Sequence, residues 1–182
     1  MTARDFDPFR LEVQAFAKEA GQFEGRWPLA QLARVAESAL AEPGGGPVTE
    51  VVWSAQGEQR FARGATQTWL HLKAGTSLAL ECQRCLQPMP VALEVERSFL
   101  FVHGEDTAAK IDADSEDDVL ALTRSLDLRE LIEDELLLAM PLVPRHDVCP
   151  KPLPLGPNED LTETMPNPFA ALAVLRRGGP LT

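Results

Sequence analysis

The stretch Glu81-Cys82-Gln83-Arg84-Cys85-Leu86-Gln87-Pro88 places two cysteines three positions apart between two runs of alternating apolar and polar residues. Leu78-Ala79-Leu80 comes before the stretch, and the second run extends from Val91 to Val102. Alternation on both sides of a short polar segment is typical of a β-hairpin. We therefore predict a hairpin whose tip carries both thiols, within an antiparallel sheet that spans residues 48–103.

The predicted sheet has four strands, and its turns are assigned from glycine positions. The first strand runs from Val51 to a turn near Gly57-Glu58, and Ala74-Gly75 is expected to form a tight hairpin turn because glycine tolerates positive φ. A meander of this kind predicts a curled, barrel-like sheet. Arg97 interrupts the apolar face of the last strand, so either a bulge turns it outward or a carboxylate holds it.

Helices are predicted before and after the sheet in the sequence, which gives an α+β fold. Residues 1–47 are expected to be helical, with one helix beginning at Asp7-Pro8 and ending near Ala20, and a second running from Pro28 to Leu40. Residues 119–141 contain the clearest helix start in the chain. Asp127 is the predicted N-cap and Glu130 its capping-box partner. The buried stripe of this helix is predicted to be Leu128, Leu131, Ile132, Leu136 and Ala139, with Glu135 on the same side.

Two further segments have distinctive composition. Residues 104–118 hold seven carboxylates and one lysine, which predicts a solvated loop. Residues 142–182 are rich in proline and are expected to form an extended arm that ends in a short helix capped by Asn167, begun by Pro168 and anchored by Phe169. That helix can dock on its own domain or in the groove of a partner.

Length and composition predict one domain over residues 1–182. The chain has 45% hydrophobic residues, enough to fill a core. It shows no apolar run long enough to span a membrane and no secretory signal, so we expect a cytoplasmic protein without membrane association. Its three cysteines are an odd number and do not form a disulfide framework.

The charge distribution argues against a general RNA-coating surface. The formal net charge is −11, and residues 101–182 carry 16 acidic and 7 basic side chains. This acidic half of the chain repels phosphate, so a basic protein is at least as plausible a partner as RNA. Direct RNA binding would require a local basic face with aromatic side chains that stack on bases. The candidates for that face are Arg60, Arg63, Lys73, Arg84 and Arg97, beside Trp53, Phe61 and Trp69.

The cysteines and one histidine form a candidate metal site. Cys82 and Cys85 have the spacing of a zinc knuckle, and His146 and Cys149 form a second pair with the same spacing. If the arm folds back to the hairpin tip, the four side chains complete a tetrahedral site for one structural zinc. Two other interpretations stay open: a tight turn with two small buried thiols and no metal, and a redox-active pair.

Catalysis has little support in the sequence. The three histidines, His71, His103 and His146, lie in no recognisable catalytic motif, and there is no glycine-rich phosphate loop. We therefore predict that the protein is not an enzyme.

Three ordered motifs resemble the bacterial YceD family, named for accumulation of large-subunit ribosomal RNA. They are the Cys-x-Arg-Cys-Leu run at 82–86, the stretch from Leu131 to His146, and the final 167–172. The resemblance implies a non-catalytic factor in synthesis, processing or stability of large-subunit (23S) ribosomal RNA. Its partner would be that RNA precursor, or a basic ribosomal or processing protein.

We predict three contact surfaces for this function. They are the hairpin tip, the acidic part of the predicted helix and the terminal helix, with the residues Cys82, Arg84, Cys85, Leu86, Glu133, Asp134, Glu135, Asn167, Pro168 and Phe169. Two alternatives remain: a zinc-dependent or thiol enzyme acting on RNA or protein, and an acidic adaptor that binds a basic ribosomal protein without touching RNA.

Overall fold

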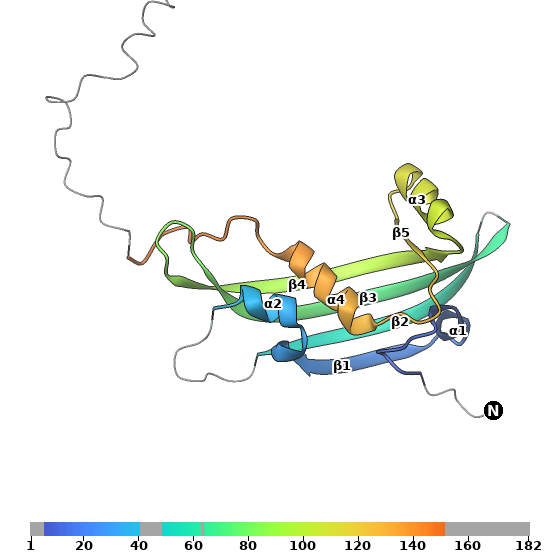
Figure 1. Ribbon diagram of the computed structural model, residues 1–182, viewed down its shortest axis with the longest axis horizontal. Coiled ribbons are helices and arrows are strands. Elements are labelled where there is room, and N and C mark those ends of the chain that lie inside the picture. Colours follow the sequence, from blue (N-terminus) through green and yellow to red (C-terminus); the bar gives the residue numbers. More distant parts are fainter. Residues whose placement is uncertain (1–5, 41–48, 63, 152–182) are drawn as a thin grey trace, which may run out of the picture. The chain divides into compact units, whose positions relative to one another are not determined.

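The computed structural model describes residues 6–40, 49–62 and 64–151. Residues up to Cys149 form one compact unit, which holds all the elements named here (Figure 1). In chain order these are α1 (Val13–Lys18), β1 (Gln22–Pro28), the 3-10 turn η1 (Leu29–Gln31), α2 (Ala33–Ser38), β2 (Glu50–Ala62), β3 (Ala65–Glu81), β4 (Pro88–Val102), α3 (Glu105–Asp114), β5 (Asp118–Ala121) and α4 (Leu128–Ala139). The predicted mixture of helices and sheet is confirmed.

The sheet has five strands in the order β1-β2-β3-β4-β5. The first four form antiparallel neighbours, whereas β5 pairs parallel to β4. A parallel pair needs a crossover connection, and α3 supplies it. Because β1 and β5 each have one neighbour, the sheet is open at both edges. The prediction of four strands is therefore wrong, and the barrel-like closure is not formed.

Two glycines that were assigned to turns lie inside long strands. Gly57 is paired with Leu70, and a Cβ there would come within 2.8 Å of the backbone of Ala17. The glycine thus allows α1 to approach the sheet closely. Gly75 pairs with Val52 on one side and Glu94 on the other, so β3 continues through it for 17 residues. Both turn predictions are wrong: the close approach of α1 accounts for Gly57, whereas a Cβ at Gly75 would have room, its nearest atom being 3.5 Å away.

One face of the sheet carries α1, α2 and α4 over the main core. Leu70, Leu72 and Phe99 of the central strands pack in one cluster with Phe16 of α1 and Ile132 of α4. The predicted N-cap of α4 is confirmed, since the Asp127 carboxylate accepts hydrogen bonds from the backbone N–H groups of the second and third helical residues at 2.9 and 3.2 Å. Leu128, Ile132 and Leu136 are buried as predicted, but Ala139 is exposed.

The opposite face carries α3, which replaces the predicted acidic loop. Ala108 of α3 packs with Trp69, Leu100 and Val119, and Ile111 lies against the same cluster. Positions 69 and 100 alternate with the core positions 70 and 99, so they point to the other side of the sheet. Two apolar residues spaced by three positions are thus enough to fix a helix within an otherwise acidic segment, which explains why composition alone was misleading.

The N-terminal part is less helical than predicted. Leu11 forms an isolated antiparallel bridge with Leu126, and α1 begins only after Glu12. The expected second helix is divided into η1 and α2 by Leu32, whose backbone is not helical. The strand β1 was missed, although Phe23 and Trp27 alternate on its inner face. Tertiary pairing overrides the helical spacing in this region.

Two remaining features concern Arg97 and the end of the described chain. Arg97 Nε donates to Glu135 Oε2 at 3.3 Å, so the alternative in which a carboxylate holds this residue is confirmed. Residues 142–151 contain no helix or strand, as predicted for the start of the arm. The predicted terminal helix lies outside the described residues. Within the described ranges, no helix is long and apolar enough to cross a membrane.

Candidate metal centre

The hairpin tip between β3 and β4 is a tight turn that holds Cys82 and Cys85. The Cys82 N–H donates to the Gln87 carbonyl at 3.0 Å, and the Leu86 N–H donates to the Cys82 carbonyl at 2.9 Å. Leu86 closes the turn with a φ of 57°, in the left-handed region that glycine usually occupies. The strands β3 and β4 pair up to Glu81 and Pro88, so the predicted hairpin with two thiols at its tip is confirmed. Both thiols are buried.

The segment after α4 returns to this tip and adds two further side chains. The Gln83 N–H donates to the Pro144 carbonyl at 2.9 Å and fixes the approach of the segment. Cys82, Cys85, His146 and Cys149 then offer ligand atoms that all lie within 4.8 Å of one another. The sequence prediction that these four residues meet is therefore confirmed, although the two pairs are about 60 positions apart.

The distances between the ligand atoms suit a tetrahedral metal ion. The Cys82 and Cys149 sulfurs are 4.0 Å apart, and Cys85 Sγ lies 3.5 Å from His146 Nδ1. With metal–ligand bonds of about 2.3 Å to sulfur and 2.0 Å to nitrogen, tetrahedral geometry requires separations of about 3.8 Å and 3.5 Å. A disulfide needs about 2.05 Å, so the thiols are arranged around a point rather than bonded to each other.

Hydrogen bonds favour ionisation at this centre. Burial raises the pKa of the Cys82 thiol, but the backbone N–H groups of His146, Arg84 and Cys85 outweigh burial and lower the pKa to about 5. Burial and the neighbouring thiols raise the pKa of Cys85 to about 11. One thiolate is thus already favoured, and a bound cation would favour the others because metal ligation requires deprotonated cysteines.

Arg84 supplies positive charge and orientation to the centre. Its Nε donates to Cys149 Sγ at 3.0 Å, and its Nη2 donates to the carbonyls of His146 and Asp147, both at 3.3 Å. Three thiolates and one neutral imidazole around a divalent cation carry one net negative charge, which a guanidinium neutralises. Outer groups of this kind orient metal ligands and are part of most metal sites.

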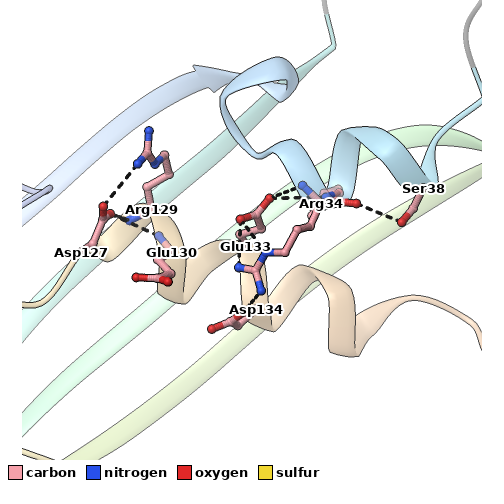
Figure 2. A network of polar contacts seen from close by, with 8 residues as sticks. Arg34, Ser38, Asp127, Arg129, Glu130, Glu133 and Asp134 are labelled. Atoms are coloured by element: carbon pink, nitrogen blue, oxygen red, sulfur yellow. Dashed lines mark hydrogen bonds and ion pairs between the residues drawn. The ribbon is translucent and has the colours of Figure 1, made fainter.

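Two of the three predicted acidic contact residues on α4, Glu133 and Asp134, are engaged by Arg34 (Figure 2), and the third pairs with Arg97. Glu133 accepts from Arg34 Nε and Nη2 at 3.0 and 2.9 Å, and also from the backbone N–H groups of Arg34 and Val35 at 2.7 and 3.4 Å. Asp134 pairs with Arg34 Nη1 at 2.6 Å. These contacts were not predicted, because no local pattern relates α2 to a helix about 100 positions later.

The third carboxylate, Glu135, is buried on the side of α4 that faces the sheet, and it pairs with Arg97 of β4. Burial raises its pKa, which Arg97 opposes. The remaining predicted contact residues, Asn167, Pro168 and Phe169, lie outside the described residues.

The described residues do not form the basic, aromatic surface considered for RNA binding. Trp53 and Trp69 are buried, and Phe61 is exposed. Among the candidate cations, Arg60 pairs with Glu58 at 2.7 Å and Lys73 with Glu96 at 2.8 Å, while Arg84 and Arg97 have the partners given above. Arg63 lies outside the described residues. The four candidate cations that the structure describes are therefore dispersed: Arg60, Lys73 and Arg97 pair with carboxylates, and Arg84 contacts the candidate centre.

A polar network on the outer face of the sheet was missed. His71 Nδ1 lies 2.7 Å from Ser98 Oγ, and His71 Nε2 lies 2.9 Å from Glu58 Oε2. Arg60 and His71 lower the pKa of Glu58 to about 2. Glu58, His71 and Ser98 come from three different strands. Only the strand register, which pairs His71 with Ser98, would have shown that they meet.

Comparison with known proteins identifies related sequences. A family described as "Large ribosomal RNA subunit accumulation protein YceD" matches residues 70–176, which include all four residues of the candidate centre. A protein of the same name from Haemophilus influenzae is 34% identical over 110 residues. That match covers 58% of this chain and 63% of the relative, so the chain spans less than two thirds of the relative's length. No solved structure matches the chain.

Proposed function

The chain belongs to the YceD family, and from this membership we propose that it is a cytoplasmic, non-catalytic factor that supports accumulation of large-subunit (23S) ribosomal RNA. The single observation that carries the proposal is the family match over residues 70–176. The described structure adds a reason to regard this range as functional, because the match includes both halves of the four-residue centre.

We propose that the centre binds one zinc ion through Cys82, Cys85, His146 and Cys149, in a structural role. Three sulfurs and one imidazole are a ligand set that zinc prefers, and four protein ligands leave no position for water or substrate. The cysteines are buried, which suits a closed site. A redox role has less support because the two thiols of the tip lie in a hairpin and not at the N-terminus of a helix, where thiolates are usually activated.

The same closure argues against a zinc-dependent or thiol enzyme. Catalytic zinc sites keep an open position for the reacting water, and a catalytic thiol must reach its substrate. We therefore favour a binding factor. Its partner is the large-subunit RNA precursor, or a basic ribosomal or processing protein, and the dispersed cations described above favour the protein.

Depletion of the protein from growing cells tests the proposed function. We expect the ratio of 23S to 16S ribosomal RNA, measured on total RNA by electrophoresis, to fall and to recover when the wild-type chain is supplied. A ratio that stays unchanged on depletion would refute the proposal. Ultraviolet crosslinking in the same cells shows whether the RNA is contacted directly, which separates an RNA-binding factor from an adaptor.

Metal analysis of the purified chain tests the zinc proposal. We expect one zinc per chain, lost in His146→Ala and Cys149→Ser. His103→Ala is the matched control, since this histidine lies away from the centre and should leave the zinc content unchanged. Circular dichroism of each variant reports whether the sheet is retained. A chain that folds and purifies without zinc from zinc-supplemented medium would exclude a structural metal at this centre.

A further inference from the structure

The strand β1 lies at an edge of the sheet and has a strand neighbour on one side only (Figure 1). The Gly57 N–H donates to the Gly21 carbonyl at 2.9 Å, so Gly21 directs its carbonyl to β2. Because this direction alternates along an antiparallel strand, every second residue after Gly21 also bonds to β2. The residues between them, Gln22, Glu24 and Arg26, therefore direct their N–H and C=O groups to the open side.

This open side is a complete edge for a further strand. At the end of β1 the Leu29 N–H donates to the Thr49 carbonyl at 2.8 Å, which agrees with the same alternation. The strand pairs with β2 through all seven of its residues without a bulge. In the part of the chain that the structure describes, no backbone hydrogen bond uses the groups on the open side. Unpaired edges of this kind are templates for pairing with another chain.

The charged side chains of β1 are complementary to a second copy of the same strand. Glu24 and Arg26 are exposed, and Arg26 reaches Glu50 of its own chain only at 3.5 Å. Antiparallel pairing about Gly25 places Glu24 of each copy opposite Arg26 of the other. The neighbouring symmetric registers place Glu24 or Arg26 opposite itself. Opposite charges on facing strands stabilise pairing and like charges oppose it, so charge selects the register about Gly25.

The aromatic side chains of β1 fit the same register. Phe23 and Trp27 lie on the face that α1, α2 and α4 cover. Phe9 stacks on Trp27 with ring centroids 5.6 Å apart, and it is 39% exposed. Pairing about Gly25 places Phe23 of each copy opposite Trp27 of the other. Aromatic pairs across strands stabilise a sheet, and the exposed Phe9 adds apolar surface beside them.

We propose that two copies of the chain pair antiparallel through β1 and join their sheets into one. Both the charges and the aromatic residues of β1 complement themselves about Gly25, as a two-fold interface requires, and this selects a second copy as the occupant. The net charge of −11 on each copy opposes association, and a seven-residue edge is short. We therefore expect a weak dimer, with a dissociation constant of about 10 to 100 µM. The inference goes beyond the proposed function and does not depend on it.

Charge exchange tests the dimer by sedimentation equilibrium of the purified full chain. The salt concentration is about 0.15 M, which screens the net charges beyond about 8 Å. Arg26→Glu places carboxylates at both positions of β1, and Glu24→Arg places guanidinium groups at both. We expect each variant alone to dimerise about tenfold or more weakly than the wild type. A mixture of the two variants restores opposite charges at every facing position, so it should form a heterodimer as tightly as the wild type dimerises.

Glu94→Arg is the matched control. Glu94 is exposed on β4 and changes the net charge by the same amount as Glu24→Arg, but it lies away from the open edge. The control variant should dimerise like the wild type. Circular dichroism shows whether each variant keeps its fold. Folded variants that dimerise like the wild type, or a mixture that stays monomeric, would overturn the proposal.

Hydrogen exchange of the Glu24 and Arg26 amides, followed by NMR, locates the interface. We expect both amides to be protected in concentrated wild-type protein and to exchange rapidly in dilute protein or in either variant alone. Protection at every concentration would assign the edge to another segment of the same chain and would overturn the proposal. A wild-type chain that stays monomeric throughout would overturn it too, and would leave the edge to a different protein.

Discussion

Replacing Glu133 with alanine tests how α2 is attached to the rest of the fold. The Glu133 carboxylate, only 11% exposed, accepts two hydrogen bonds from backbone N–H groups at the start of α2 and two from the Arg34 side chain. Removing a cap of this kind costs about 1 to 2 kcal/mol. The Arg34 side chain is 48% exposed, so its ion pair adds less than about 1 kcal/mol. We expect Glu133→Ala to lower the free energy of unfolding by about 1 to 3 kcal/mol.

Urea unfolding followed by tryptophan fluorescence measures this loss, because Trp27, Trp53 and Trp69 are all buried. With a slope of about 2 kcal/mol per molar urea, the midpoint should fall by about 1 M. Asp134→Ala is the matched control. Asp134 pairs with the same arginine but is half-exposed and caps no backbone, so its loss should stay below about 1 kcal/mol. Equal losses in the two variants would refute the capping argument.

The pH dependence of Glu133→Gln provides a second measurement. Burial raises the pKa of Glu133, but the Arg34 side chain and the two backbone N–H groups outweigh burial and lower it below the ordinary value. A carboxyl whose pKa is lower in the folded state stabilises the fold above its unfolded pKa and loses that contribution as pH falls through the folded pKa. The difference in unfolding free energy between the wild type and Glu133→Gln should therefore be complete above the ordinary glutamate pKa of about 4.3 and decrease as the pH falls below it.

Three further substitutions have expected outcomes. Gly57→Ala should lower the melting temperature by an amount equivalent to about 1 to 3 kcal/mol, because its Cβ would collide with α1, whereas Gly75→Ala has room, its nearest atom being 3.5 Å away. Leu86→Gly should leave zinc content unchanged and raise stability by up to about 1 kcal/mol in urea unfolding, since it removes left-handed strain but adds unfolded-state entropy. Arg97→Leu should reduce stability more at pH 8 than at pH 5, because burial already raises the pKa of Glu135 and an unpaired carboxylate is costly only when ionised; an equal loss at both pH values would contradict this.

The sequence predicted the parts of the fold that depend on local signals. The cap at Asp127 and the hairpin around Cys82 and Cys85 each follow from neighbouring residues, and both are confirmed. The meeting of these cysteines with His146 and Cys149 was also predictable, because matching ligand spacing carries information over long separations. The presence of zinc stays a prediction.

The errors arose where distant packing decides the conformation. Gly57 is a turn residue by propensity, yet it lies within β2 because α1 occupies the space above it. The acidic segment forms α3 because its Ala108 packs against Trp69, which lies about 40 positions earlier in the chain. Glu133 has the composition of a surface residue and is buried by its pairing with Arg34. In each case the determining partner comes from another element, and no local pattern reports it.

The candidate centre lies where two segments of the chain meet with little apolar core to hold them together. Residues 141–149 leave the end of α4 without regular structure of their own, and the turn they reach is a tip that extends beyond the last paired residues of β3 and β4. Neither segment has a large apolar core beneath it, since the cluster at the tip consists of the three cysteines with Met89 against them. A small cluster of this size buries too little apolar surface to order two loops. A zinc ion held by the four candidate ligands would supply the missing stabilisation at one point, and it would fix residues 141–149 against the hairpin tip.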